Sequence, residues 1–298
     1  MEQIKKIDIH AHASYFADIA PTFSPTTDLK WPSAEIVLDF YEKLGVEKGI
    51  LQPIVSPEKM HAIITNEEVI TIVKNHPDRF LWFCDVDPRA MGNTRDTNLG
   101  HLLEYYKSLG AIGCGEITAN MHVDDPLVEN LFGYCAELGL PVTIHLSPYF
   151  GNRYGLIDEV GLRKLEGTLK KFPKLKVIGH SQPFWREIGD NPLGDYPTGP
   201  VKNGRIPVLL RKYENLYCDL SGDSGSNALM RDREYAAKFV EEFSDRLMYA
   251  CDICSSANTF PFKFNDFLDS MRESGEISEA NYRKIVRENA IRFFNLPF

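Results

Sequence analysis

The sequence predicts an α/β protein built as a (β/α)8 barrel, the TIM-barrel fold in which helices surround a ring of parallel strands. Eight short apolar runs alternate with longer amphipathic segments along the chain, and this alternation is typical of a parallel sheet covered by helices. The length of 298 residues suits a single barrel, which takes about 250 residues. A doubly wound open sheet is the alternative, but no Gly-x-Gly-x-x-Gly motif follows a strand to indicate a dinucleotide site.

The predicted elements follow one another in barrel order. Strands are expected at residues 5–10, 49–55, 79–86, 111–117, 141–147, 175–181, 215–221 and 246–252, where β-branched and aromatic residues gather. Helical periodicity fills the segments between them, as in SAEIVLDFYEKLG and REYAAKFVEEFS. Asp125 and Pro126 open one helix, while Gly45, Gly110 and Gly139 follow the ends of others.

Two longer segments rich in Pro and Gly interrupt this alternation. Residues 13–33 follow the first strand, and residues 182–204 follow the sixth. Both segments leave the carboxyl end of a strand, where the loops of a barrel frame its active mouth. We therefore predict a single barrel domain over residues 1–298, with 13–33 and 182–204 as rim loops.

The composition disfavours several classes of partner and location. A net charge of −9 and a pI of about 5.4 disfavour nucleic acid and anionic membranes, which attract basic surfaces. No apolar run approaches the roughly 18 residues of a membrane span, and the N-terminal MEQIKKIDIHAHAS lacks the apolar stretch of a secretory signal. Four of the six cysteines lie in apolar, strand-like runs, which favours a reduced, cytoplasmic chain.

Ionisable side chains gather at the carboxyl ends of the predicted strands. The first strand is closed by His10 and His12, and the fourth, fifth, sixth and eighth are closed by Glu116, His145, His180 and Asp252. A single histidine at a strand end is more often a core residue than a ligand. However, these ends meet at one rim of a barrel, and imidazole and carboxylate groups bind zinc, iron and manganese. The sequence therefore predicts a metal site at the mouth.

Other candidate residues have a structural alternative. Cys251 and Cys254 have redox spacing on the eighth strand, but without a second pair they are interpreted as core or near-site residues. Asp8 shares a strand face with the first histidine, so it either orients a ligand or contacts a helix. Asp219 and Asp223 flank the end of the seventh strand, and their loop either contacts substrate or forms a solvated turn.

Substrate-binding residues are expected in the rim loops, where specificity is commonly placed. The candidates are Arg153, Tyr154 and Arg186, and His122 and Asp124 also lie in such loops. Each of these residues has an alternative interpretation as a solvated or structural side chain. An arginine among them would hold a substrate carboxylate through two parallel hydrogen bonds.

Five short motifs carry a resemblance to a known family. DIHAH on the first strand, GEI on the fourth, TIH on the fifth, IGH on the sixth and ACD on the eighth resemble the amidohydrolase superfamily. More narrowly, the chain resembles the family 2 branch, which includes the aminocarboxymuconate-semialdehyde decarboxylase group. The resemblance implies a (β/α)8 barrel that binds one or two divalent ions, zinc first, with manganese or iron as alternatives.

The resemblance also implies a role for each rim residue. His10, His12 and His145 resemble metal ligands, and Asp252 resembles the aspartate that binds metal and handles the proton of the attacking water. His180 resembles the histidine that binds a second metal or polarises substrate or water. Glu116 stands where binuclear members carry a bridging Glu or a carboxylated Lys, so it is expected to bind metal as well.

Two activities are compatible with these residues. The first is a metal-dependent hydrolase that acts on a small carbonyl, amide, ester or lactone substrate through a metal-activated water. In it, Asp252 is the general acid–base group and His180 stabilises the oxyanion. The alternative is a metal-dependent, non-oxidative decarboxylase of an aromatic or unsaturated carboxylic acid. Glu116 favours hydrolysis, because a deoxyribonuclease branch of the superfamily carries a similar Gly-Glu-Ile. A small-molecule substrate is expected, and a homodimer is plausible from the resemblance.

Overall fold

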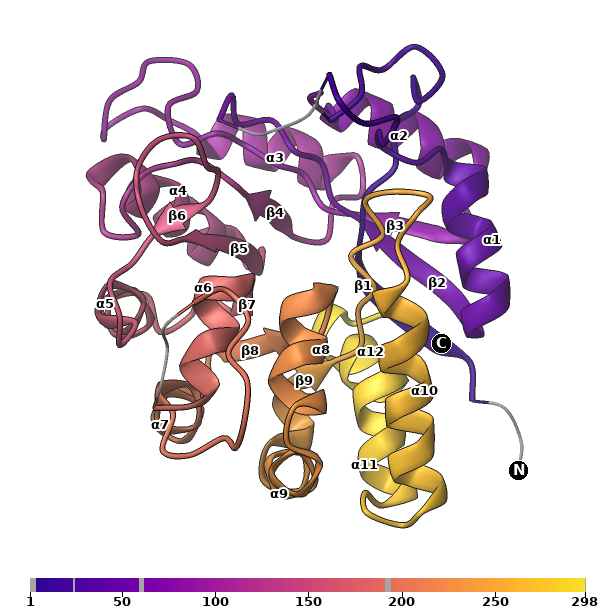
Figure 1. The fold of residues 1–298 in the computed structure, drawn as a ribbon. Helices are drawn as coiled ribbons and strands as arrows, with labels where there is room; N and C mark the ends of the chain where they lie inside the picture. Colours follow the sequence, from indigo (N-terminus) through magenta and orange to yellow (C-terminus); the bar gives the residue numbers. More distant parts are fainter. Residues whose placement is uncertain (1–3, 24, 59–61, 191–193, 298) are drawn as a thin grey trace.

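The strands of the computed structural model lie in a ring that helices surround (Figure 1), and the structure describes residues 4–23, 25–58, 62–190 and 194–297. The barrel strands are β1 (Lys6–Ala11), β2 (Val46–Leu51), β3 (Phe80–Trp82), β4 (Cys114–Ile117), β5 (Val142–Ser147), β7 (Val177–His180), β8 (Leu216–Asp219) and β9 (Leu247–Met248). A two-residue strand, β6 (Leu156–Ile157), pairs with the end of β5 off this ring. Each predicted strand therefore overlaps an observed one, although the third and eighth are much shorter than their apolar runs.

Helices separate successive strands, as the sequence predicts. They are α1 (Ala34–Leu44), α2 (Asn66–Asn75), α3 (Gly100–Ser108), α4 (Pro126–Leu138), α5 (Arg163–Lys171), α6 (Gln182–Trp185), α7 (Arg205–Lys212), α8 (Gly222–Met230), α9 (Arg233–Phe243), α10 (Phe260–Glu273), α11 (Glu279–Arg283) and α12 (Asn289–Phe294). The predicted boundaries of α4 are confirmed: Asp125 accepts a hydrogen bond from Leu127 N, and Gly139 ends the helix in the left-handed conformation. No helix in the described ranges is both long and apolar enough to cross a membrane.

All ring strands run parallel, in two sheets that meet at two seams. One sheet has the order β1-β2-β3, and the other runs β4-β5-β7-β8-β9. At the first seam, Cys84 N donates to Gly113 O at 3.0 Å, and at the second, Asp252 N donates to His10 O at 2.7 Å. These bonds join the segment after β3 to β4, and β1 to the segment after β9. The strand order is therefore that of the predicted barrel and not of a doubly wound sheet.

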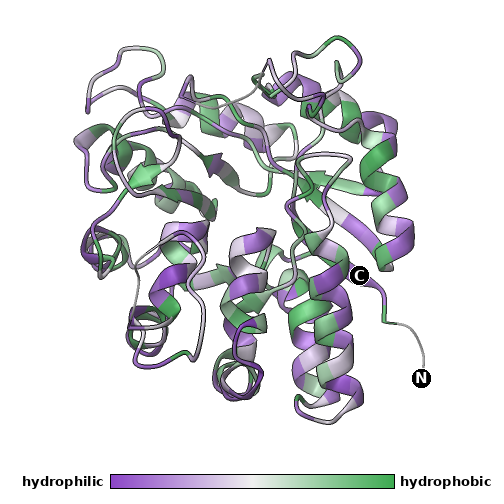
Figure 2. Cartoon of the chain, in the orientation of Figure 1, coloured by the Kyte–Doolittle hydropathy of each residue, from purple (hydrophilic) through white to green (hydrophobic). Residues whose placement is uncertain are grey.

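Apolar side chains fill the barrel at the end opposite the carboxyl ends of the strands, which we call its lower end. They also line the surface between strands and helices. Ile7, Ile9, Ile50 and Ile178 are fully buried in an inner cluster that also contains Phe294 of α12. Figure 2 shows green, apolar faces on the strands and on the sides of the helices that turn toward them. Burial of each such side chain contributes about 1.5–3 kcal/mol. The core thus occupies the lower barrel and leaves the polar residues at the carboxyl ends of the strands.

The two predicted rim loops differ in structure. Residues 13–23 and 25–33 contain no helix or strand, and Ser14 Oγ ties their start to Glu68 of α2 at 2.8 Å. The description of residues 182–204 as a loop is wrong in part, because they begin with α6 and a 3-10 turn over Arg186–Ile188. The turn forms because Phe184 and Trp185 are buried in the core, and Trp185 Nε1 donates to Asp219 O at 2.8 Å. Residues 24 and 191–193 lie outside the described ranges.

Candidate metal centre

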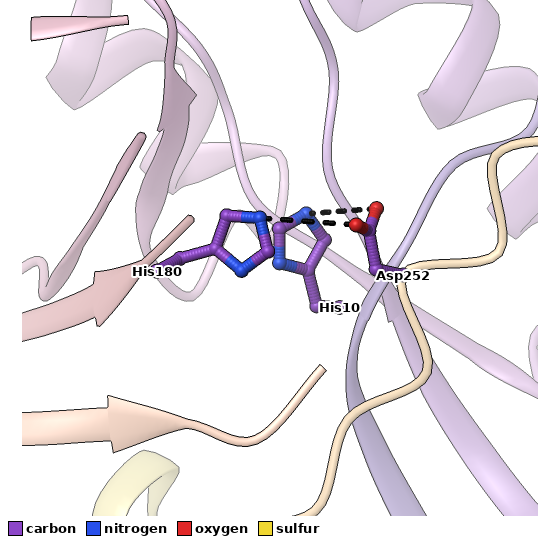
Figure 3. Close-up of side chains that lie close together, drawn as sticks. All are labelled: His10, His180 and Asp252. Carbon is purple, nitrogen blue, oxygen red and sulfur yellow. Dashed lines mark ion pairs between the residues drawn. The ribbon is translucent and has the colours of Figure 1, made fainter. Parts of the chain in front are cut away.

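Two histidines of the first strand converge at the barrel mouth. Residues i and i+2 of a strand point the same way, so His10 of β1 and His12 just beyond it face the same side. Their Nε2 atoms lie 3.1 Å apart, and both side chains are almost completely buried. Figure 3 shows how His180 and Asp252 approach His10 from β7 and from the segment after β9. Side chains far apart in the sequence therefore meet at one point.

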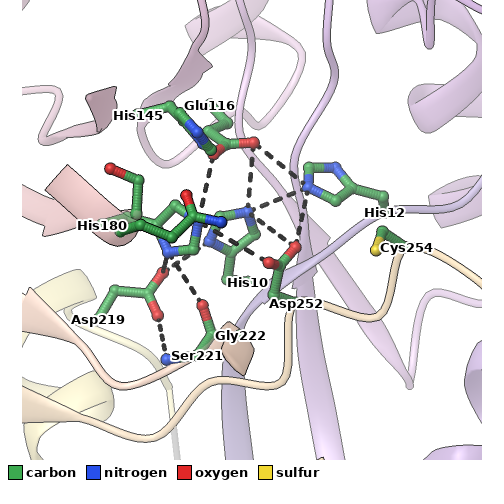
Figure 4. A network of polar contacts seen from close by, with 12 residues as sticks. His10, His12, Glu116, His145, His180, Asp219, Ser221, Gly222, Asp252 and Cys254 are labelled. Carbon is green, nitrogen blue, oxygen red and sulfur yellow. Dashed lines mark hydrogen bonds and ion pairs between the residues drawn. The ribbon is translucent and has the colours of Figure 1, made fainter. Parts of the chain in front are cut away.

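Four atoms form a compact cage at this point (Figure 4). Glu116 Oε2 lies 3.4 Å from His12 Nε2 and 3.6 Å from His10 Nε2. Asp252 Oδ1 lies 3.5 Å from His12 Nε2 and 3.9 Å from His10 Nε2. Ligands about 2.1 Å from a tetrahedral ion are separated by about 3.4 Å. The distances from each carboxylate to the two histidines are in this range, and His10, His12 and Glu116 form a group that could hold a divalent ion such as zinc.

The remaining two histidines lie against the other oxygen of Glu116. His145 Nδ1 forms a 2.6 Å hydrogen bond with Glu116 Oε1, and His180 Nε2 lies 3.4 Å from the same oxygen. His180 Nε2 is also 3.8 Å from Asp252 Oδ2. Glu116, His145 and His180 thus form a second group that could hold a metal ion, next to the group of His10, His12 and Glu116, and His10, His180 and Asp252 form a third. Glu116 belongs to the first two groups, which is the place expected of a bridging carboxylate.

Groups outside the cage fix the orientation of the imidazole rings. His10 Nδ1 contacts Asp219 Oδ2 at 2.6 Å, and His12 Nδ1 contacts Gln52 O at 2.9 Å. Because a carbonyl or carboxylate oxygen accepts, each Nδ1 carries a proton, so Nε2 is the atom of each ring that can bind a metal ion in the cage. His180 Nδ1 lies 3.1 Å from Ser221 Oγ. The ligand nitrogens are therefore held ready for a cation.

The electrostatics of the cage also favour a cation. Burial lowers the pKa of His10, but the carboxylate of Asp219, with help from Glu116, raises it well above its ordinary value. Burial likewise opposes ionisation of Glu116, yet His145 and His10 hold the pKa of this carboxyl well below its usual range. Burial also lowers the pKa of His12, but Asp252 and Glu116 raise it above its ordinary value, so the carboxylates around the cage favour positive charge at its centre. A divalent ion would supply this charge in place of the histidine protons.

A glycine lets the backbone approach the cage closely. Gly222 has a φ of +68°, and a Cβ atom there would lie 3.1 Å from Asp252 Oδ2 and 3.8 Å from His180 Cε1. A side chain at this position would be strained and would push against a ligand carboxylate. The turn between β8 and α8 is thus shaped to pack against the metal centre.

A cavity of about 380 Å³, which we call the mouth cavity, opens beside His145. Tyr154 lines it, with its ring centroid 4.6 Å from that of His145. Burial, together with the charges of Glu116 and Asp252, raises the pKa of Tyr154, so its hydroxyl is protonated at neutral pH. Arg153 also lines the cavity, and its guanidinium lies 3.7 Å from Asp195. Among the described residues, no hydrogen-bond partner of the Tyr154 hydroxyl is found.

The loop that carries Arg153 and Tyr154 is tied to the segment after β4. Asn120 Nδ2 donates to Tyr149 O at 3.3 Å and to Gly155 O at 3.2 Å. Asn120 Oδ1 accepts a 2.7 Å bond from Gly151 N. One buried amide therefore holds both ends and the middle of the loop, and this positioning residue was not singled out in the sequence.

The structure brings together the six predicted rim residues, His10, His12, Glu116, His145, His180 and Asp252. Arg153 and Tyr154 reach the mouth cavity, whereas Arg186 lies in the 3-10 turn after α6, and its Nε is buried without a hydrogen-bond partner in the described ranges. His122 packs edge-on against Phe150, and Asp124 pairs with Lys164 at 2.7 Å. Those last two interactions are structural.

Two acidic residues next to the cage, Asp219 and Asp8, each had two interpretations from the sequence. Asp219 is fully buried and contacts His10, so the interpretation of its loop as a solvated turn is wrong for this residue. The sequence did contain a sign of this role, because Asp219 lies near the end of a predicted strand, as the ligand residues do. Asp8 instead accepts hydrogen bonds from His10 N, Tyr41 Oη and Cys251 N. Of its two alternatives, the structure therefore shows the contact with helix α1.

The two cysteines of CDIC are placed differently from the prediction. β9 ends at Met248, so Cys251 and Cys254 follow the strand and do not lie on it. Cys251 is buried, and Cys254 is half-buried beside Asp252 and His12 (Figure 4). All the described cysteines are free thiols, which agrees with their interpretation as core or near-site residues.

Comparisons with known proteins identify the family. The family model Amidohydro_2, described as amidohydrolase, matches residues 7–296. An uncharacterised TIM-barrel protein, Bb4693 of Bordetella bronchiseptica, is 19% identical with a TM-score of 0.64, and the match covers 98% of this chain and 99% of that chain. No curated protein matches the chain.

Two further solved structures share the fold. A probable 2-pyrone-4,6-dicarboxylic acid hydrolase of Acinetobacter baumannii is 14% identical with a TM-score of 0.60, over 98% of this chain and 100% of that chain. A dihydroxybenzoic acid decarboxylase of Polaromonas sp. JS666 with bound manganese is 18% identical with a TM-score of 0.58, over 99% of this chain and 98% of that chain. At these identities the likeness shows the fold alone. The match over nearly the whole chain shows that the protein belongs to amidohydrolase family 2, a family of metal-dependent enzymes.

Proposed function

We propose that the protein is a metal-dependent hydrolase of a small carbonyl, amide, ester or lactone substrate, with residues 1–298 acting as one barrel domain. The position of Asp252 carries this proposal. Its carboxylate is 21% exposed, whereas that of Glu116 is only 4% exposed. One oxygen of Asp252 belongs to the cage and the other faces His180. A carboxylate with this placement can exchange a proton with a reactant in the mouth.

The cage residues define what a bound ion would do. His10, His12, Glu116 and Asp252 would hold it, with zinc as the first candidate. Such an ion would lower the pKa of a water molecule and polarise a substrate carbonyl. A second ion on the other oxygen of Glu116 would have to replace the 2.6 Å hydrogen bond from His145. We therefore propose that the four-atom cage is filled first.

The acid–base chemistry is assigned to Asp252. As the water oxygen attacks the carbonyl carbon, its proton passes to a carboxylate oxygen of Asp252. The same proton then goes to the leaving nitrogen or oxygen as the carbon–heteroatom bond breaks. Each step conserves the proton, so the carboxylate is regenerated for the next turnover.

His180 and Tyr154 are assigned to the developing oxyanion and to substrate orientation. Burial lowers the pKa of His180, so the ring is neutral at physiological pH. When Ser221 Oγ donates to Nδ1, the ring proton lies on Nε2 and can be donated to the carbonyl oxygen. The Tyr154 hydroxyl supplies a second donor, because its ring lies against that of His145, with ring centroids 4.6 Å apart. Arg153 is the group in the mouth cavity that would bind a substrate carboxylate.

The second candidate function is non-oxidative decarboxylation. Arg153 favours it as well, because a guanidinium beside the mouth can hold the carboxylate of an acid substrate. The position of Glu116 between His10, His12, His145 and His180 supports hydrolysis more strongly, since it gives the centre room for a bridging carboxylate. Hydrolysis therefore remains the proposal, and carbon dioxide release is measured as the competing outcome.

The test combines metal analysis with a substrate screen. Protein loaded with zinc, manganese or iron is assayed for hydrolysis of lactones, esters and amides and for carbon dioxide release from aromatic acids. We expect hydrolysis, and we expect Asp252→Asn to reduce kcat by at least about 100-fold. Asp124→Asn, a rim carboxylate paired with Lys164, is the matched control and keeps full activity. Carbon dioxide release without any hydrolysis would replace the proposal with the decarboxylase.

A further inference from the structure

The chain turns sharply directly after His180, where β7 ends. His145 of β5 and His180 of β7 are register partners, and their pairing is the last between these two strands. The residues that follow them are Leu146 and Ser181, and Ser181 lies outside β7, with a φ of +90° and a ψ of 168°. The strand therefore stops at the histidine that the proposed reaction assigns to the oxyanion.

The backbone conformation of Ser181 is unusual for a residue with a side chain. A positive φ combined with a ψ between about 150° and 180° is a region that essentially only glycine occupies. Glycine adopts it without strain because it has no Cβ atom. Ser181 is also almost completely buried. A serine at a position that suits glycine indicates that the hydroxyl supplies a contact that glycine lacks.

The hydroxyl of Ser181 takes the place of a further backbone pair between β5 and β7. Its Oγ accepts a 2.9 Å hydrogen bond from Leu146 N and donates a 3.0 Å hydrogen bond to Leu146 O. A hydroxyl has one donor and two acceptor lone pairs, so it can make both bonds at once. The two buried backbone groups that the next ladder position would use are therefore satisfied, while the main chain of Ser181 is free to turn. We call this pair of hydrogen bonds the serine clamp.

The turn at Ser181 leads the main chain into α6, which is tied to the site by a second set of bonds. Trp185 N donates to Ser181 O at 3.0 Å, and Trp185 Nε1 donates to Asp219 O at 2.8 Å. Gln182, directly after the turn, lines the mouth cavity. Ser181 thus lies where the end of β7, the start of α6 and the wall of the mouth cavity meet.

We propose that Ser181 is a positioning residue for His180 and acts through its hydroxyl. His180 Nδ1 lies 3.1 Å from Ser221 Oγ, and His180 Nε2 lies 3.4 Å from Glu116 Oε1 (Figure 4). Both contacts require the backbone of His180 to stay at the last ladder position, and the serine clamp holds it there. Without the hydroxyl, Leu146 loses both partners and the end of β7 is released from β5. The expected effect on turnover rests on the proposed function, whereas the effect on the imidazole ring does not.

The test uses Ser181→Gly in the full chain, because glycine accepts the turn and removes only the hydroxyl. The matched control is Ser244→Ala, since Ser244 is also buried and its Oγ donates to Asn281 at 3.0 Å at the lower end of the barrel. Amide exchange followed by NMR measures the serine clamp, and we expect the Leu146 amide to exchange at least about tenfold faster in Ser181→Gly alone. The imidazole ¹⁵N signals of His180, assigned with a His180→Asn variant, measure the ring. They should indicate a proton on Nε2 in the wild type and in Ser244→Ala, and a mixture of both tautomers in Ser181→Gly.

Turnover then connects the serine clamp with the reaction. Zinc-loaded Ser181→Gly should lose at least about tenfold in kcat on an ester or lactone that the wild type hydrolyses. KM and the Kd of zinc should not change, because the four-atom cage does not contain His180. Wild-type exchange of the Leu146 amide in Ser181→Gly, or faster exchange with unchanged His180 signals, would overturn the positioning role. Altered His180 signals in a protein that hydrolyses none of the substrates support that role and count against the proposed function alone.

Discussion

Replacement of Asp219 by Asn tests whether the residues outside the cage prepare it for a metal. Asp219 Oδ2 lies 2.6 Å from His10 Nδ1, and Oδ1 accepts a 2.7 Å hydrogen bond from Ser221 N. In Asp219→Asn, the amide oxygen can keep the bond from Ser221, which leaves the NH₂ group facing His10. Two donors cannot bond to each other, so the proton of His10 moves to Nε2. The lone pair that faces the cage is then lost.

The size of the effect follows from this change of tautomer. Removing the partner of a ligand histidine lowers metal affinity by about 10–100-fold, or about 1.4–2.7 kcal/mol. Asp219 also raises the pKa of His10 in the metal-free protein, so its removal weakens proton competition and offsets part of the loss. We therefore expect the zinc affinity of Asp219→Asn to be lower than that of the wild type by about 10-fold at pH 7. Above the pKa of His10 the loss should approach about 100-fold.

The assay is competition with a chromophoric zinc chelator at pH 7.0 and at pH 9.0. Asp124→Asn removes a similar charge from the rim and is the matched control, with unchanged affinity expected. Circular dichroism shows whether the variant is folded. An affinity of Asp219→Asn equal to that of the wild type at both pH values would refute the argument that Asp219 sets the state of His10.

Four further outcomes follow from the geometry of the site. Gly222→Ala places a Cβ 3.1 Å from Asp252 Oδ2 at a φ of +68°, so zinc affinity should fall about tenfold, and an unchanged affinity contradicts the close approach. Asn120→Ala releases the 149–155 loop, so trypsin should cut after Arg153 at least about tenfold faster, while a wild-type cleavage rate means that the loop is held by other contacts. In the metal-free protein the pKa of His10 lies well above 6.5, and bound metal displaces this proton, so zinc affinity should rise with pH and level off above that pKa. A flat profile from pH 6 to pH 9 excludes this linkage. Removal of the metal by a chelator should lower Tm by about 5–10 °C at a metal concentration near 1,000 Kd, and an unchanged scanning-calorimetry trace contradicts it.

The barrel and the cage could be predicted from the sequence for the same reason. Parallel strands buried on both faces are apolar throughout, so an acid or histidine at the end of such a run stands out. His145 and Asp252 were found in this way. Because topology then brings all carboxyl ends to one rim, the meeting of these side chains followed from the fold without any knowledge of side-chain contacts.

The residues outside the cage could not be predicted in the same way. Asp8 and Asp219 lie on strands with the same pattern, but the role of each depends on which group its carboxylate reaches, Tyr41 in one case and His10 in the other. The four residues of α6 have no helical period to detect, and their fold is decided by the burial of Trp185. Such roles come from three-dimensional packing, which a single sequence does not contain.

The metal centre and the closure of the barrel depend on the same residues. At the seam between β1 and β9, the backbone of Asp252 donates to His10 O at 2.7 Å, and the side chains of these two residues face each other in the cage. At the other seam, Gly115 N donates to Cys84 O at 2.8 Å, and Glu116 follows directly. The cage thus takes ligands from both sheets and from both seams. Because a divalent ion would hold these ligands together, it would also join the two sheets where their strands are shortest.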